Sequence, residues 1–146
     1  MASAQTKISG TAQCGKPEPT YAIQVGDRPD HSFALSQVKC EYTKPIEMAG
    51  IQAKEFLSTY FSEISGARAT LRASVDATMA DGDKYRARAQ GSAILKEGVL
   101  ESAEGTWSFG GGTGKLKGIR GKGTFKGKGG PEGITYEIEG EYELPK

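Results

Sequence analysis

His31 is the single histidine of the sequence, so it is the natural candidate for a general base at neutral pH. It follows Asp30 at the start of a predicted strand, where a polar turn residue is the ordinary explanation, and we therefore expect no catalytic triad. Glu55 and Glu63, the remaining candidate catalytic residues, share one parity in the segment 52–64. Desolvation would raise the pKa of an inward carboxyl and could make it an acid or base. The alternative for both glutamates is a solvated outer face.

The glycine-rich stretch 110–115 resembles a phosphate-binding loop but lacks two of its required residues. A Walker A motif needs glycine where Phe109 stands and serine or threonine where Leu116 stands. We therefore expect a tight connection between two strands. With one histidine and two cysteines, the sequence predicts no zinc site of ordinary composition, and we expect no metal and no cofactor.

A run of basic residues between positions 115 and 128 could indicate a nucleic-acid surface. The following segment, 134–144, carries four glutamates on its odd face and apolar residues on its even face. Neighbouring strands of a hairpin place such side chains about 5 Å apart, so lysines and glutamates should pair on the outer surface. Without free positive charge there is little counterion release, and we expect no nucleic-acid partner.

The two cysteines, Cys14 and Cys40, bear on where the protein resides. The start Ala2-Ser3-Ala4 is typical of a signal-peptide cleavage junction. An exported protein reaches an oxidising compartment, so we expect a Cys14–Cys40 disulfide, with two free thiols in a cytosolic protein as the alternative. The sequence then predicts a periplasmic or secreted protein, in which residues 1–5 are a disordered remnant of the junction and residues 6–146 form one domain.

Alternation of apolar and polar residues defines the elements that must position any site. Between 67 and 95 the odd positions are apolar on both sides of a turn, which predicts a hairpin. A loop at 81–83 would pair residues as follows: Met79 with Tyr85, Val75 with Ala89, and Leu71 with Ala93. Further strands are expected near 8–14, 21–25, 33–42, 99–109, 120–128 and 134–144, with a bulge in 33–42 where the parity changes.

The segment 52–64 fits either a helix or a strand; its Ser, Thr and aromatic residues favour a strand. About eight strands with short turns predict an all-β, closed, eight-stranded antiparallel barrel with little helix. The 146 residues suffice for one domain, hydrophobic residues make up 36%, and the net charge is +1. Since the longest apolar runs are three residues, we expect no membrane-spanning segment.

Parity places five aromatic residues on the inner faces, and these are the predicted ligand-binding residues: Tyr85, Trp107, Phe109, Tyr136 and Tyr142. They could line an apolar pocket in which each tyrosine offers a polar tip. Plain core packing is the alternative. An interior volume of about 300 Å³ or more would favour binding, whereas a solid barrel would exclude it.

The stretch 105–123, which contains Trp-Ser-Phe and Gly-Gly-Thr-Gly-Lys, resembles the allene oxide cyclase and dirigent barrels. With the final Glu-Gly-Glu-Tyr, it is also similar to small exported bacterial proteins of unassigned function. The resemblance covers about residues 65–144 and implies an eight-stranded barrel, usually oligomeric, that holds an apolar ligand without a cofactor. The catalytic residues of those families are not matched one by one to positions of this sequence, so cyclase activity is not carried over from them.

From these observations we expect an exported β-barrel that binds a small apolar molecule. If the protein is an enzyme, we expect cofactor-free isomerase or cyclase chemistry. The alternative is a non-enzymatic structural or interaction protein with a filled barrel. A homo-oligomer is a further expectation.

Overall fold

The computed structural model describes residues 5–131 and 133–145, and this part of the chain is built almost entirely of antiparallel strands. The strands are β1 (Thr6–Cys14), β2 (Thr20–Gln24), β3 (His31–Lys44), β4 (Glu47–Met48), β5 (Ile51–Ser65), β6 (Arg68–Met79), β7 (Lys84–Lys96), β8 (Val99–Gly112), β9 (Arg120–Gly130) and β10 (Gly133–Glu143). One 3-10 turn, η1 (Gly114–Leu116), lies between β8 and β9. The glycine-rich stretch 110–115 therefore joins two strands, as expected.

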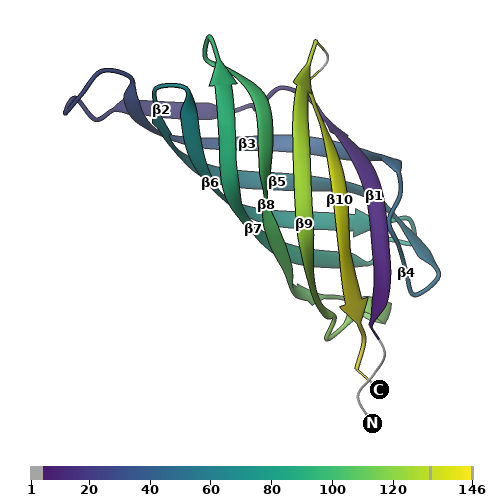
Figure 1. Ribbon diagram of the computed structural model, residues 1–146. Helices are drawn as coiled ribbons and strands as arrows, with labels where there is room; N and C mark the ends of the chain where they lie inside the picture. The colour runs from purple at the N-terminus through teal and green to yellow at the C-terminus, as the bar shows by residue number, and fades with distance from the viewer. Residues whose placement is uncertain (1–4, 132, 146) are drawn as a thin grey trace.

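The barrel closes through pairings between distant parts of the chain. Strands β5 to β10 follow one another as a meander, β10 pairs with β1, and β1 pairs with β3, which returns to β5. This circuit is the predicted eight-stranded antiparallel barrel. In Figure 1 the strands β1, β9 and β10 run from top to bottom in front of β3 and β5. Strand β2 stands outside the circuit, because it pairs only with the first half of β3.

The β6–β7 hairpin has the predicted inner face but a different register. Our expected pairing of Met79 with Tyr85 is wrong by two residues, because Ala77 lies opposite Tyr85. The other two expected pairs shift in the same way, to Val75 with Ala87 and Leu71 with Gly91. A shift of two keeps every side chain on its face, so the apolar odd positions still point inward.

The position of a glycine explains this register. The loop is 80–82 rather than 81–83, with the Met79 N–H donating to the Asp83 carbonyl at 2.8 Å. Gly82 ends the loop with φ of 93°, in the left-handed region that a three-residue hairpin loop requires at that place. The parity argument alone could not distinguish the two loops.

Strand β5 confirms the strand interpretation of the segment 52–64. Its pairing with β6 shifts register between Ala53 and Glu55, which marks a bulge. Before the bulge the odd residues are buried, and after it the even residues Phe56 and Ser62 are buried. The apolar residues on both faces, which made the segment look helical, are the result of this change.

The bulge predicted within 33–42 is absent there. The even residues of β3 face inward throughout this stretch, and the register shift against β1 comes later, where Thr11 pairs with Lys44 and Ala12 with Tyr42. The prediction was wrong because Phe33 and Leu35 are apolar residues on the outer face, where they are 39% and 52% exposed.

Outer charges on β9 and β10 lie opposite each other at three positions, which is most of the predicted arrangement. Glu137 lies opposite Lys126, Glu141 opposite Lys122, and Glu143 opposite Arg120. Lys128 lies opposite Thr135 instead, so three of the four basic residues of β9 have an acidic residue opposite them.

Inside the barrel, small residues leave room for a few large rings. Trp107 packs against the backbone of Gly123 and Gly140 on the neighbouring strands, at places where a Cβ would collide with its ring. Cys14 and Cys40 lie opposite each other on β1 and β3, fully buried, and form the expected disulfide. Among the described residues, none belongs to a helix long and apolar enough to cross a membrane. Residues 1–4 of the expected signal-peptide remnant lie outside the described residues.

Candidate functional site

The barrel interior contains a cavity of about 120 Å³, which is below the 300 Å³ that we expected to favour ligand binding. Its walls come from inward positions of all eight barrel strands. The aromatic lining residues are Tyr42, Phe56, Tyr60, Tyr85, Trp107, Phe109, Phe125 and Tyr136. The volume nevertheless exceeds that of several waters, so the interior is not packed solid.

Four of the five predicted ligand-binding aromatics line this cavity: Tyr85, Trp107, Phe109 and Tyr136. Phe109 contacts Tyr85 and Trp107 edge to face, with ring centroids 5.4 and 4.9 Å apart, so these three rings form one rigid wall. The Trp107 ring is fixed further by its Nε1–H, which donates to the Thr124 carbonyl at 3.2 Å.

Tyr142, the fifth predicted residue, lies elsewhere. It packs against the core, but its hydroxyl accepts a hydrogen bond from the Ala49 N–H at 3.0 Å and it does not line the cavity. The sequence argument missed Tyr42, Phe56, Tyr60 and Phe125. Phe125 shares a strand face with glycines, and strict parity in β3 would have indicated Tyr42. Phe56 and Tyr60 lie beyond the bulge in β5, where no signal in the sequence shows which face is buried.

A pair of tyrosines provides the main polar feature of the cavity wall. The hydroxyls of Tyr42 and Tyr85 are 2.8 Å apart and hydrogen-bonded. Burial raises the pKa of Tyr85 to about 12 and raises the pKa of Tyr42 well above its ordinary value. Burial, followed by the nearby Tyr60, also raises the pKa of Tyr136 to about 12. All three phenols are therefore neutral at neutral pH, and they can donate or accept hydrogen bonds but cannot serve as bases.

No charged side chain among the described residues lines this cavity. Glu55 lies on the outer side of the barrel beside Lys39, whose Nζ is 3.3 Å from the Glu55 carboxylate. Glu63 also faces outward, where its carboxylate binds His31. The two candidate catalytic glutamates thus occupy the solvated outer face that we gave as the alternative, and they are not brought together.

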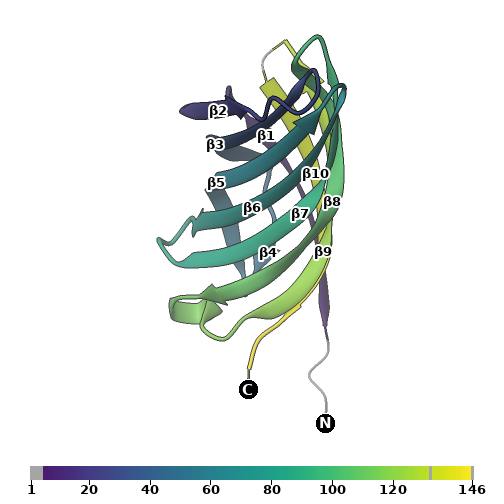
Figure 2. The same cartoon turned by 90° about the vertical axis from the view of Figure 1, so that its left-hand side faces the viewer.

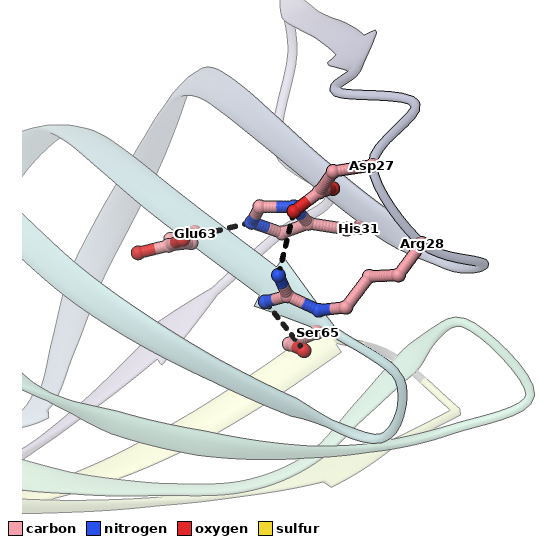
Figure 3. Close-up of polar contacts among 5 residues, drawn as sticks. All are labelled: Asp27, Arg28, His31, Glu63 and Ser65. Carbon is pink, nitrogen blue, oxygen red and sulfur yellow. Dashed lines mark hydrogen bonds and ion pairs between the residues drawn. The ribbon is translucent and has the colours of Figure 1, made fainter.

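His31 forms a second polar site, at the end of the barrel near β2 (Figure 3). Its Nδ1 lies 2.6 Å from Asp27 and its Nε2 2.8 Å from Glu63, so both ring nitrogens face carboxylates. Hydrogen bonding to Asp27 first, and then to Glu63, raises the pKa of the buried His31. The same hydrogen bond lowers the pKa of Asp27.

Arg28 completes this cluster. It contacts Asp27 at 2.8 Å and donates to the Ser65 hydroxyl at 3.2 Å (Figure 3). The cluster joins the β2–β3 loop to the end of β5. Because an imidazolium with both N–H groups donated to carboxylates has no free lone pair, the geometry suits a clamp better than a general base.

Fold and cavity together place the chain in the class of small antiparallel β-barrels with an apolar interior. No family model matches the chain, and no curated protein matches it. Among solved structures, the chain is similar to a conserved protein of unknown function from Rhodopseudomonas palustris, with a TM-score of 0.48 and 8% sequence identity over 97% of this chain and 100% of that chain. The description of that protein names no ligand and no activity.

Proposed function

We propose that this protein binds a small apolar molecule inside its barrel. The observation that carries the proposal is the 120 Å³ cavity with its apolar and aromatic walls. Apolar cavities of about 150 Å³ stay dry and accept benzene, so a ring of about that size matches the available volume. The tyrosine hydroxyls on the wall favour a ligand with one small polar group, such as a phenol, because they can pair with it.

The resemblance of the stretch 105–123 to the allene oxide cyclase and dirigent barrels supports the same function. Binding is favoured over cyclase or isomerase chemistry, because the wall residues offer neutral phenols and no carboxylate or imidazole at the cavity. The Cys14–Cys40 disulfide supports an oxidising compartment, periplasmic or extracellular, as the place of action.

Trp107 provides the test, because it is the single tryptophan of the sequence and it lines the cavity. Titration with phenol, and separately with toluene, should change Trp107 fluorescence in a saturable manner. The cavity-filling variant Ala89→Leu should abolish this response, since Ala89 lines the cavity and lies opposite Trp107. Val99→Leu, an exposed substitution on β8, is the matched control and should leave the titration unchanged.

The second candidate function, a structural or interaction protein without a ligand, predicts a different result. In that case neither probe would saturate, and the Ala89→Leu protein would be indistinguishable from the parent. Native mass spectrometry of protein purified from its own host would then show no retained small molecule.

A further inference from the structure

Most of the exposed large hydrophobic residues in the described part of the chain lie on the outer face around β2. Six large hydrophobic residues lie on it: Tyr21, Ile23, Val25, Phe33, Leu35 and Phe61, which we call the β2 patch. Across the strands Ile23 lies opposite Phe33 and Tyr21 opposite Leu35, and Leu35 in turn lies opposite Phe61. The patch is therefore continuous over three adjacent strands.

Exposure of the patch is large for a single molecule. Tyr21 is 67% and Ile23 73% exposed, and the remaining members are between 39% and 52% exposed. With about 150–250 Å² for a whole aromatic side chain and somewhat less for aliphatic ones, the exposed area is on the order of 550 Å². This area is near the upper end of the roughly 300–600 Å² that the largest apolar patch of a monomer covers, and patches of that size often mark binding surfaces.

Strand β2 also carries an unpaired backbone edge. Figures 1 and 2 show it as the outermost strand beside β3. The Val25 N–H donates to the His31 carbonyl, and the Gln37 N–H donates to the Pro19 carbonyl, so the odd residues of β2 bond to β3. Because bonding alternates along an antiparallel strand, the N–H groups of Thr20, Ala22 and Gln24 point to the free edge.

The strand Thr20–Gln24 itself contains neither a charge nor a proline, two features that commonly protect an exposed edge from pairing. The clamp of His31, Asp27 and Glu63 further holds the loop that follows β2 in place, so the edge is presented in a defined orientation.

We propose that the β2 edge, together with the apolar side chains of β2, forms a dimer interface with a second copy of this chain. Two β2 strands paired antiparallel across a two-fold axis would satisfy the edge groups of both copies and place Tyr21 of one copy beside Ile23 of the other. An uncharged strand can pair with its own copy in a second molecule. Antiparallel pairing of the two β2 strands gives a closed dimer, because it leaves no further free edge on either strand. This inference is independent of the proposed ligand.

Light scattering after size exclusion, performed on the full chain over a wide concentration range, tests the proposal. The parent protein should be a dimer, and Ile23→Lys should raise the dissociation constant by about 30-fold or more, as loss of a central contact does. Val99→Lys is the matched control: Val99 is 68% exposed, lies on β8 outside the patch, and should leave the dimer intact.

Ala22→Pro separates pairing of the edge from apolar contact. It removes an N–H that points to the free edge and leaves the bonds between β2 and β3, which an edge strand tolerates. This variant should also be monomeric while its thermal melt stays close to that of the parent. In the parent dimer, hydrogen exchange at Ala22 and Gln24 should slow as concentration rises.

A parent protein that remains monomeric at the highest concentration would overturn the proposal. If that monomer cosedimented with phosphatidylcholine or phosphatidylglycerol vesicles, the patch would belong to a lipid surface instead. A dimer that survives both Ile23→Lys and Ala22→Pro would place the interface elsewhere and would equally reject β2.

Discussion

At the scale of single residues, the buried polar groups determine what the interior can bind. Tyr42 and Tyr85 satisfy each other across 2.8 Å, so neither hydroxyl is left without a partner in the barrel. A ligand with a small polar group must compete with this pair or add to it, whereas an apolar ligand leaves it untouched. The tyrosine pair thus sets the polarity that the cavity accepts.

Replacing both tyrosines should therefore cost less than the two single replacements added together. Tyr85→Phe leaves the Tyr42 hydroxyl buried without its partner, and we expect a loss of about 1–3 kcal/mol in the free energy of unfolding. The double variant Tyr42→Phe/Tyr85→Phe should lose clearly less than the two single losses added together. Urea unfolding of the four proteins measures this coupling, and strictly additive losses would contradict it.

His31 should make stability depend on pH in a defined direction. Its pKa in the folded protein lies above the ordinary 6.5, so its contribution is complete below pH 6.5 and is lost as pH rises through the folded value. The pKa of Asp27 lies below its ordinary 3.8, so its contribution is complete above pH 3.8 and is lost as pH falls through the folded value. Both contributions are thus complete between pH 3.8 and 6.5.

Urea unfolding between pH 5 and 9 checks the His31 part of this prediction. The parent should become less stable as the pH rises, and His31→Gln should flatten this dependence because glutamine does not titrate. The same slope in both proteins would assign the pH dependence to other groups.

At the scale of elements, turns and one covalent bond set how the strands meet. Gly82, with φ of 93°, selects the loop 80–82 and with it the whole β6–β7 register. Cys14 and Cys40 join β1 to β3, and the pairing of these two strands is one of those that close the barrel. The glycine therefore fixes how β6 pairs with β7, whereas the disulfide holds β1 against β3.

Gly82→Ala should destabilise the protein by about 1 kcal/mol, because an alanine in the left-handed region brings its Cβ close to the carbonyl. A Cβ at Gly82 would meet no atom within 4 Å, so the cost comes from the backbone alone. Gly15→Ala is the matched control, since Gly15 has equally open space and no positive φ. Equal urea midpoints for the two variants would refute this explanation of the turn.

Reduction of the disulfide should lower the free energy of unfolding by about 3 kcal/mol, the entropy of closing a loop of this length. The sequence separation is 26 residues, and both cysteines are fully buried. Reductant should therefore be added in denaturant, followed by refolding in its presence, before urea curves are compared. An unchanged midpoint would mean that β1 pairs with β3 equally well without the bond.

At the scale of the whole molecule, the barrel couples its cavity to its stability. The residues that line the cavity come from all eight strands of the barrel, so unfolding destroys the binding site completely. A ligand that binds only the folded state must stabilise it by mass action. The same closure leaves β2 as the strand with an open edge that bears the β2 patch.

Phenol or toluene at a hundred times its dissociation constant should therefore raise the free energy of unfolding by about 2.7 kcal/mol. Urea unfolding at several ligand concentrations measures the increase. Ala89→Leu should eliminate it and Val99→Leu should retain it. Stabilisation that persisted in the Ala89→Leu protein would indicate binding outside the cavity.

Much of this protein could be predicted from the sequence because side chains in a strand alternate with a period of two. That alternation identified the barrel strands other than β5, the inner face of the β6–β7 hairpin, and four aromatic residues that line the cavity. The Cys14–Cys40 disulfide was expected from the signs of export, and most of the opposing charges on β9 and β10 were expected from the alternation.

Features that depend on how distant segments meet could be seen only in the tertiary structure. The bulge after Ala53 reverses the parity of β5, and alternation cannot locate a bulge where both faces carry apolar residues. The His31 clamp brings together residues 27 and 63, from a loop and a strand that meet only when β3 pairs with β5. Cavity volume and the open edge of β2 likewise exist only in the closed circuit, because they depend on which strands pair and not on the residues of any one strand.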